Sequence, residues 1–434
     1  MDKMADVLGR AGAWCGQNKY LSAIKNAFQN FMPLTIAGAI GVLWCNVLVN
    51  ESTGLGMFFK PIMALDFLNP AFQAVNFCTI SCITVGITLG IAQEIGVWNM
   101  GAERAGYIPG LVGLAAWLSV TNTSHMVDGA KEAFTGVAGN ELGATGLFTG
   151  MIIGVLSVEL FCFFEKQEAL KIKMPEQVPP GVARAFEVLV PATITLIITA
   201  CIGSACYSLT GLYLNDVIKN GVQGPLGAVG STVPGVMIIY LVIMLFWLVG
   251  IHGNNMLSAV KEALFTPLAL ENVEAFNKGE TPKNIINMYA LQMWGEFGGS
   301  GVTIGLVIAI MIFGKREDNK AIATLSLVPG LFNINETVTF GIPMVLNPIL
   351  GIPFVVAPLI TIIIGYVLTV IGFCPVACLT VPWTTPPILF GFLSCGANVM
   401  GAVTQAILIV VSTVIYTPFL ISYEKYQNKQ AAEA

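Results

Sequence analysis

Charged residues are scarce in this chain, and their scarcity excludes a water-soluble globular fold. Of its 434 residues, only 10% are Asp, Glu, Lys or Arg, whereas 55% are hydrophobic. A typical soluble domain carries about 25% charged residues. So few charges cannot cover a surface that faces water. The chain is therefore expected to lie in a lipid bilayer.

Other features are also missing, and each absence excludes a class of function. The net charge is −5 and no long basic tract occurs, which argues against nucleic-acid binding. There is no Walker A pattern, so the chain is not expected to hydrolyse ATP. No Ser/His/Asp arrangement and no cysteine or histidine cluster at metal-ligand spacing is visible, so neither a metal nor a cofactor is expected. The ten cysteines are interpreted as small buried residues.

Long apolar segments are abundant in the first half of the chain. Membrane spans of about 20 residues are predicted near 27–49, 71–93, 107–121, 144–164, 188–213 and 234–250. Lysine and arginine gather before the first segment and after the fourth, and they return near 315–320 and 425–429. The positive-inside rule then predicts that both termini are cytoplasmic. An even number of spans follows, and we estimate ten.

Glycine and proline interrupt the apolar segments of the second half at GGSG (298–301), GIPMVLNPILGIP (341–353) and VPWTTPP (381–387). A bilayer tolerates broken backbone only where it is buried in protein or lines a wet cavity. Such segments form the substrate sites of many transporters. The chain is therefore expected to be an all-α membrane protein with a scaffold, residues 1–230, and a substrate-binding part, residues 231–434.

Two ionisable residues near these breaks, His252 and Glu336, are candidates for catalysis. A charge at the centre of a membrane span costs about 3 kcal/mol, so ionisable residues that persist there are candidates for function. Each also has a structural interpretation, as a satisfied buried histidine and as part of a network that caps a broken helix. A carboxylate and an imidazole among amides suit a polyhydroxylated ligand. They could also activate one hydroxyl by general base action.

The expected substrate-binding residues are amides, small residues at a break that allow close backbone approach, and tryptophans beside the breaks. They are Asn254, Asn333, Asn335, Gly299, Ser300, Trp247, Trp294 and Trp383. A flat indole face suits the apolar face of a sugar ring, although tryptophan also forms belts at membrane interfaces. Glu296 could bind a ligand or be a structural partner.

Several motifs together resemble enzyme IIC, the membrane component of bacterial sugar phosphotransferase systems. They include WLVGIHG (247–253), GGSGVT (298–303), NETVTFGIPMVLNP (335–348) and VPWTTP (381–386), with KNAFQNFMPLTIAGA (25–39) and YTPF (416–419) near the ends. The resemblance is to the lactose/cellobiose/diacetylchitobiose branch and covers nearly the whole chain. Thr337 stands where the family usually has proline, and Glu296 has no clear counterpart.

The resemblance implies a homodimer in the bacterial cytoplasmic membrane, with ten spans and two re-entrant hairpins. The N-terminal half would form the dimer contact, and the C-terminal half would hold a β-linked disaccharide such as cellobiose, diacetylchitobiose or lactose. Phosphorylated enzyme IIB would transfer a phosphoryl group from its phosphocysteine to the sugar 6-hydroxyl. Enzyme IIA and the general phosphotransferase proteins would act upstream, starting from phosphoenolpyruvate.

The family's histidine and glutamate fall on His252 and Glu336. By that resemblance, Glu336 is the base or the group that orients the hydroxyl, and His252 binds the hydroxyl or the incoming phosphoryl oxygen. Composition and topology alone leave two rivals open. One is a proton-coupled secondary sugar transporter with these two residues as a proton relay. The other is a sugar receptor without catalysis.

Overall fold

The computed structural model describes residues 10, 14, 17–51, 55–125, 134–175, 177–342 and 344–433. Within these ranges the chain is mostly helical, and its strands are one short antiparallel pair, Ser124–His125 with Phe134–Thr135. Of the described helices, five are long and apolar enough to cross a membrane, or up to seven if each of two bent pairs is one span. The all-α fold is confirmed, while the number of ten spans stays a prediction.

The apolar segments predicted in the first half are helical, but their limits differ in places. The helices predicted at 27–49 and 188–213 begin eight residues earlier, and the segment 71–93 is divided by a 42° bend between Ser81 and Ile83. These helices are α2 (Lys19–Leu43), α3 (Asn69–Asn76), α4 (Ile83–Met100), α6 (Ile108–Val120), α8 (Ala144–Glu165), α9 (Pro180–Thr210) and α12 (Val233–Leu248). Shorter helices and turns connect them: η1 (Trp44–Leu48), η2 (Leu55–Met57), η3 (Lys60–Leu68), η4 (Phe77–Ser81), α5 (Ala102–Ala105), α7 (Gly139–Leu142), η5 (Glu168–Leu170), α10 (Leu214–Ile218), η6 (Lys219–Gln223) and α11 (Gly224–Gly230).

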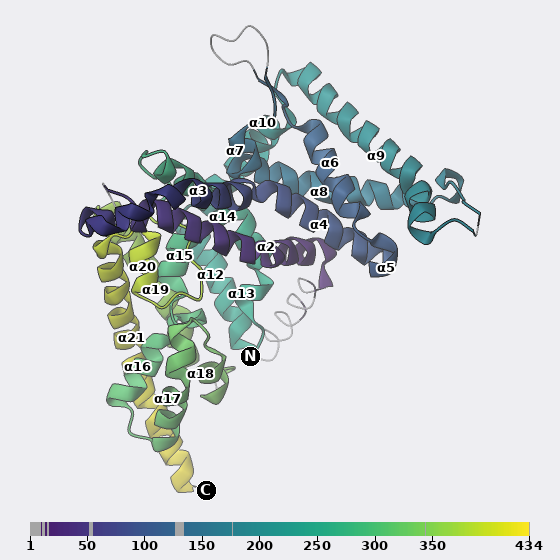
Figure 1. Cartoon of the computed structure of the whole chain (residues 1–434). Helices are drawn as coiled ribbons and strands as arrows, with labels where there is room; N and C mark the ends of the chain where they lie inside the picture. Colours follow the sequence, from purple (N-terminus) through teal and green to yellow (C-terminus); the bar gives the residue numbers. More distant parts are fainter. Residues whose placement is uncertain are drawn as a thin grey trace. The chain divides into compact units, whose positions relative to one another are not determined.

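The chain divides into two compact units. The N-terminal unit contains Gln17–Gly38 and Val75–Gly227, and the C-terminal unit contains Ala39–Ala74 and Ala228–Ala434. In the N-terminal unit α4, α6 and α8 pack against one another, and α9 packs on α6 and α8 (Figure 1). A Cβ added at Gly113 would collide with Ala92, and one added at Gly150 would collide with Thr88. These small residues therefore allow the close helix packing that is typical of membrane proteins.

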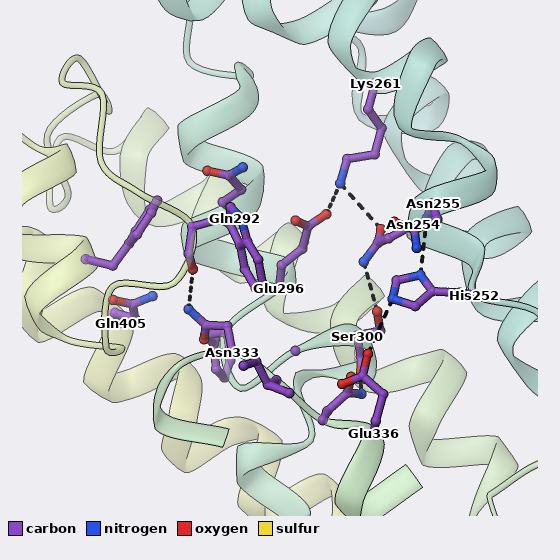
Figure 2. Close-up of a pocket in the computed structure, with 16 residues that line it drawn as sticks. His252, Asn254, Asn255, Lys261, Gln292, Glu296, Ser300, Asn333, Glu336 and Gln405 are labelled. Carbon is purple, nitrogen blue, oxygen red and sulfur yellow. Dashed lines mark hydrogen bonds and ion pairs between the residues drawn. The ribbon is translucent and has the colours of Figure 1, made fainter. Parts of the chain in front are cut away.

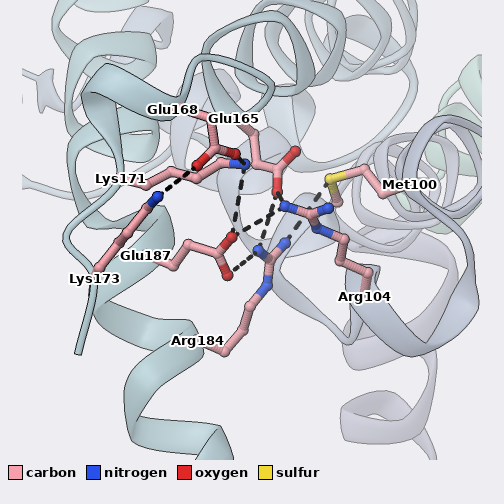
Figure 3. A network of polar contacts seen from close by, with 8 residues as sticks. All are labelled: Met100, Arg104, Glu165, Glu168, Lys171, Lys173, Arg184 and Glu187. Atoms are coloured by element: carbon pink, nitrogen blue, oxygen red, sulfur yellow. Dashed lines mark hydrogen bonds and ion pairs between the residues drawn. The ribbon is translucent and has the colours of Figure 1, made fainter. Parts of the chain in front are cut away.

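A charged network ties together one end of the N-terminal unit (Figure 3). The Glu165 carboxylate, at the end of α8, is buried and pairs with Arg104 of α5 at 2.8 Å and with Arg184 of α9 at 3.0 Å. Arg184 also pairs with Glu187 at 2.8 Å. In the loop between α8 and α9, hydrogen bonding to Lys171 holds the pKa of the Glu168 carboxyl below its ordinary value. The network joins three helices through one buried carboxylate.

The C-terminal unit is built around one large hydrophobic core cluster of its helices. After α12 come α13 (Gly253–Met256), α14 (Ser258–Asn277), α15 (Met288–Gly295), η7 (Ser300–Val302), α16 (Ile304–Phe313), α17 (Glu317–Leu331), α18 (Glu336–Gly341), α19 (Gly351–Val370), α20 (Leu389–Ser394) and α21 (Val399–Glu433). The long α21 packs along α16 and α19.

The predicted breaks are present in this unit. The segment Met288–Val302, which contains α15 and GGSG, is bent by 60° relative to α16, directly after GGSG. No regular helix covers 342–350 or 371–388 among the residues that the structure describes. At Gly301 the backbone φ is +79°, and an added Cβ would collide with the ring of Phe354. Only glycine fits that combination of left-handed backbone and close packing, so the backbone conformation beside the bend requires glycine at this position.

Candidate functional site

A polar cavity lies within the C-terminal unit, where the broken segments meet (Figure 2). Its empty volume is about 810 Å³, including space open to solvent, which falls within the range of small-molecule sites. Eight of the ten predicted site residues line it: His252, Asn254, Gly299, Ser300, Asn333, Asn335, Glu336 and Trp383. The structure therefore brings together residues from four separate breaks in the chain.

His252 stands at the break between α12 and α14. It is the N-cap of the short α13, and its Nδ1 accepts a hydrogen bond from the backbone N–H of Asn255 at 3.2 Å. Since Nδ1 is the acceptor, the neutral imidazole carries its proton on Nε2. The ring also packs on Trp247, with centroids 4.4 Å apart. Cap and ring contact together fix the direction of the Nε2–H group.

Glu336 opens α18 and faces His252 across the cavity. Its Oε1 lies 3.7 Å from Nε2 of His252, which is too long for a direct hydrogen bond. An oxygen atom about 2.8 Å from each group, an ordinary hydrogen-bond distance, would fit between them as the apex of a triangle. The two side chains are 35% and 46% exposed, so a solute in the cavity can reach both. This geometry is suited to holding one hydroxyl between a donor and an acceptor.

Asn333 connects three of the broken segments through its amide group. Its Oδ1 accepts from the backbone N–H of Gly298 at 2.6 Å. Its Nδ2 donates to the carbonyl oxygens of Trp383 at 2.6 Å and Thr385 at 3.0 Å. The side chain that the sequence suggests for substrate binding thus satisfies backbone groups of the cavity wall.

Two other predicted amides also stabilise the wall. Asn335 donates to the backbone carbonyl of Ser300 at 2.7 Å, and Asn254 donates to the hydroxyl of the same serine at 2.9 Å. Gly299 has φ +86°, and a Cβ there would lie 2.7 Å from that of Asn335. The glycine therefore allows the close approach that the Asn335 contact requires. Direct contact of these residues with substrate stays a prediction.

The three predicted tryptophans differ in position. Trp383 lines the cavity and is 44% exposed. Trp247 and Trp294 are almost fully buried, and neither is among the lining residues. Trp247 packs against the imidazole of His252. Trp294 packs so closely against Gly365 that a Cβ added to this glycine would collide with the indole. The geometry gives these two a structural position and leaves Trp383 as the indole that can stack on a ligand.

Several lining residues do not follow from the sequence reasoning. These are Asn255, Lys261, Gln292, Phe297, Ile334, Phe390 and Gln405, together with Glu296, for which the sequence favoured neither interpretation. Gln405 accepts from the backbone N–H groups of Ile388 at 2.7 Å and Gly391 at 2.8 Å, which holds the start of α20. The one available signal was a polar residue inside an apolar run. No group of His, Cys, Asp and Glu within the described part of the chain could hold a metal ion.

Comparison with known proteins identifies the family. Residues 25–358 match the family described as "Phosphotransferase system, EIIC". The chain belongs to this family. The prediction made from the motifs is therefore confirmed, and the proton-coupled transporter receives no support. EIIC components transport sugar and work with EIIB, which carries out the phosphorylation.

Similar proteins cover this EIIC chain almost completely. It is 32% identical to the oligo-beta-mannoside-specific EIIC component of Bacillus subtilis, over 98% of this chain and 94% of that protein. It is 29% identical to the cellobiose-specific EIIC component of Lactococcus lactis, over 98% of both. The crystal structure of ChbC, the IIC component of an N,N'-diacetylchitobiose-specific phosphotransferase system, matches with a TM-score of 0.88 and 29% identity over 97% of both chains. The multi-pass membrane fold is thus confirmed.

Some relatives extend beyond this chain. The lactose-specific EIICB component of Streptococcus mutans is 31% identical over 96% of this chain but only 71% of its own length. Its name joins the C and B components in one protein, which fits an EIIC chain that works with EIIB.

Proposed function

We propose that this EIIC chain binds a β-linked disaccharide in the cavity, carries it across the membrane and presents its 6-hydroxyl to phosphorylated EIIB. The observation that carries the proposal is the His252–Glu336 pair, with Nε2 and Oε1 3.7 Å apart in an amide-rich cavity. The names of the relatives support the substrate class, because cellobiose, lactose, oligo-β-mannosides and diacetylchitobiose are all β-linked.

The two side chains have different tasks in the transfer. Glu336 accepts the hydrogen bond of the sugar 6-hydroxyl and takes its proton. His252 donates from Nε2 to that oxygen or to a phosphoryl oxygen. It is not the base, because its Nδ1 accepts from Asn255 and its Nε2 therefore already carries a proton. The S–P bond of the EIIB phosphocysteine breaks as the O–P bond to the sugar forms. Positioning and charge stabilisation suffice for such a transfer.

The wider arrangement is part of the same proposal. The lysines and arginines of the loops favour cytoplasmic N- and C-termini in the bacterial inner membrane. Residues 1–230 are the scaffold and the contact of a homodimer, and residues 231–434 are the part that carries the sugar. EIIA and the general phosphotransferase proteins supply the phosphoryl group from phosphoenolpyruvate. The chain itself requires no cofactor.

The test uses the purified full-length chain in proteoliposomes with phosphorylated EIIB and a panel of β-disaccharides, and it measures sugar 6-phosphate. We expect product with at least one disaccharide, and loss of product with His252→Ala or Glu336→Gln although both variants bind sugar. The matched control is Glu274→Gln, since Glu274 pairs with Lys278 on the exposed surface. Full turnover by both variants would contradict the assignment, as would uptake driven by a proton gradient without EIIB.

A further inference from the structure

The cavity lining contains a buried ion pair, Lys261 with Glu296, that has no task in the proposed phosphoryl transfer. The two side chains are only 7% and 16% exposed. Burying two charges is costly, and replacement by apolar residues is often neutral or stabilising. A pair that persists in a membrane protein, beside a polar cavity, is therefore a candidate for function.

The contacts of Glu296 leave one of its oxygens available. Its Oε1 accepts from the Lys261 ammonium and from the hydroxyl of buried Tyr240 at 2.7 Å. Its Oε2 accepts no hydrogen bond from the described residues. In Figure 2 this second oxygen points away from Lys261. Glu296 therefore presents an unused carboxylate acceptor while its other oxygen is held in place by two donors.

Gln292 is a further polar residue on this part of the wall. It lines the cavity one helical turn before Glu296. Its amide oxygen is buried and has no partner among the described residues. Unlike the other amides of the wall described above, Gln292 is not used to join broken segments through this oxygen.

The pair is separated from the reactive end of the cavity by two intervening residues. Lys261 Nζ lies 3.4 Å from Oδ1 of Asn254, and Asn254 in turn donates to the hydroxyl of Ser300 at 2.9 Å. Ser300 lies next to the His252–Glu336 pair in Figure 2, whereas Lys261 and Glu296 lie apart from it. A disaccharide with its 6-hydroxyl between His252 and Glu336 would place its second ring away from these two residues, in another part of the cavity.

We propose that Glu296 is a substrate-binding residue whose Oε2 accepts a hydrogen bond from a hydroxyl on the sugar ring that is not phosphorylated. Lys261 is its positioning residue, which holds the carboxylate oriented through their ion pair. The inference rests on the function proposed above and adds a specificity determinant to it. A carboxylate accepts hydrogen bonds and donates none, so the site selects a free hydroxyl at one carbon. A site of this kind rejects analogues that lack the hydroxyl.

The experiment measures the Kd of the purified full-length chain by calorimetry. The ligands are methyl β-cellobioside and analogues in which hydrogen replaces, in turn, each hydroxyl of the ring that is not phosphorylated. In the wild type we expect one analogue to bind about 10- to 100-fold more weakly, because hydrogen bonds to charged groups are the strong ones. The double variant Lys261→Met/Glu296→Leu leaves no unpaired charge. It should bind the parent sugar as weakly as it binds that analogue.

Further variants separate positioning from folding. Lys261→Arg should retain the discrimination between parent and analogue, and Lys261→Met alone should reduce it. Glu296→Gln keeps the side-chain shape and should reduce the discrimination about 3- to 10-fold, since neutral hydrogen bonds are roughly half as strong. If the double variant does not fold, the Glu296→Gln variant is used to test the inference. The matched control is Lys278→Met/Glu274→Leu, an exposed pair on the same helical segment, which should leave every Kd unchanged.

Equal binding of all analogues by the wild type would overturn the inference, and so would undiminished discrimination in the double variant. In both cases the chain still binds a disaccharide, so the proposed function survives. Failure of the wild type to bind any β-disaccharide would overturn the proposed function and this inference together.

Discussion

Replacing His252 by asparagine or by glutamine separates the two tasks of the imidazole. Asparagine ends near the position of Nδ1, so its Oδ1 can accept from the Asn255 N–H and keep the cap of α13. It cannot reach Glu336, which lies 3.7 Å beyond Nε2. Glutamine reaches the Nε2 position with an N–H donor but loses the cap. Both variants also lose the ring contact with Trp247, so the comparison between them separates the cap from the Nε2 donor.

The expected magnitudes differ in kind. His252→Asn should keep a higher Tm than His252→Gln, since both lose the ring contact with Trp247 but only glutamine loses the cap. It should lower the rate of sugar phosphorylation about 10²- to 10³-fold, the typical effect of removing one donor to a developing charge. His252→Gln should lower stability by about 1 kcal/mol, the typical value of an N-cap, and retain more phosphorylation than His252→Asn. The assays are thermal unfolding in detergent and single-turnover transfer from phosphorylated EIIB, with sugar Kd measured separately. Equal rates for the two variants, or an unimpaired asparagine variant, would refute the assigned tasks.

Three further predictions concern the cavity and the fold. Trp383→Ala should weaken disaccharide binding about tenfold, because an indole face contributes binding energy beyond that expected from its buried area alone. Kd measurements check this. Gly299→Ala should lower the Tm by several degrees, since it adds about 1–3 kcal/mol of strain where φ is +86° and Asn335 is close; a stability equal to the wild type would contradict the crowding. Glu165→Gln should destabilise the N-terminal unit more than Glu168→Gln, because only Glu165 is buried between two arginines; equal Tm values for the two would show that the network is unimportant.

The breaks were predictable from the sequence because their signals are local. Gly301 requires a left-handed backbone, and such positions can be recognised from glycine in an apolar segment. His252 and Glu336 were predictable because ionisable residues near membrane spans are rare and costly. The family motifs added the pairing of the two residues. Neither argument required knowledge of long-range packing.

The rest depended on contacts that no local pattern reveals. Lys261 lies in α14 beside Glu262, and a lysine next to a glutamate is typical of an exposed helix face, although here it is buried against Glu296. Trp247 and Trp294 flank breaks as Trp383 does, yet they point into the core. Which side of a broken helix faces the cavity is set by the neighbouring helices. The sequence therefore predicted the segments of the site better than the direction of each side chain.

The amides of the cavity show why its breaks and its chemistry depend on each other. A broken helix leaves backbone N–H and carbonyl groups without partners, and these must be satisfied inside the protein. Asn333 makes hydrogen bonds to backbone groups of Gly298 and of two residues in the 381–387 segment. Gln405 accepts hydrogen bonds from backbone N–H groups at the start of α20. Most amide groups of the wall are thus used to join segments. By the proposed function, the sugar would be held by His252 and Glu336 and, by our inference, by Glu296, so any shift of one segment would also move these groups.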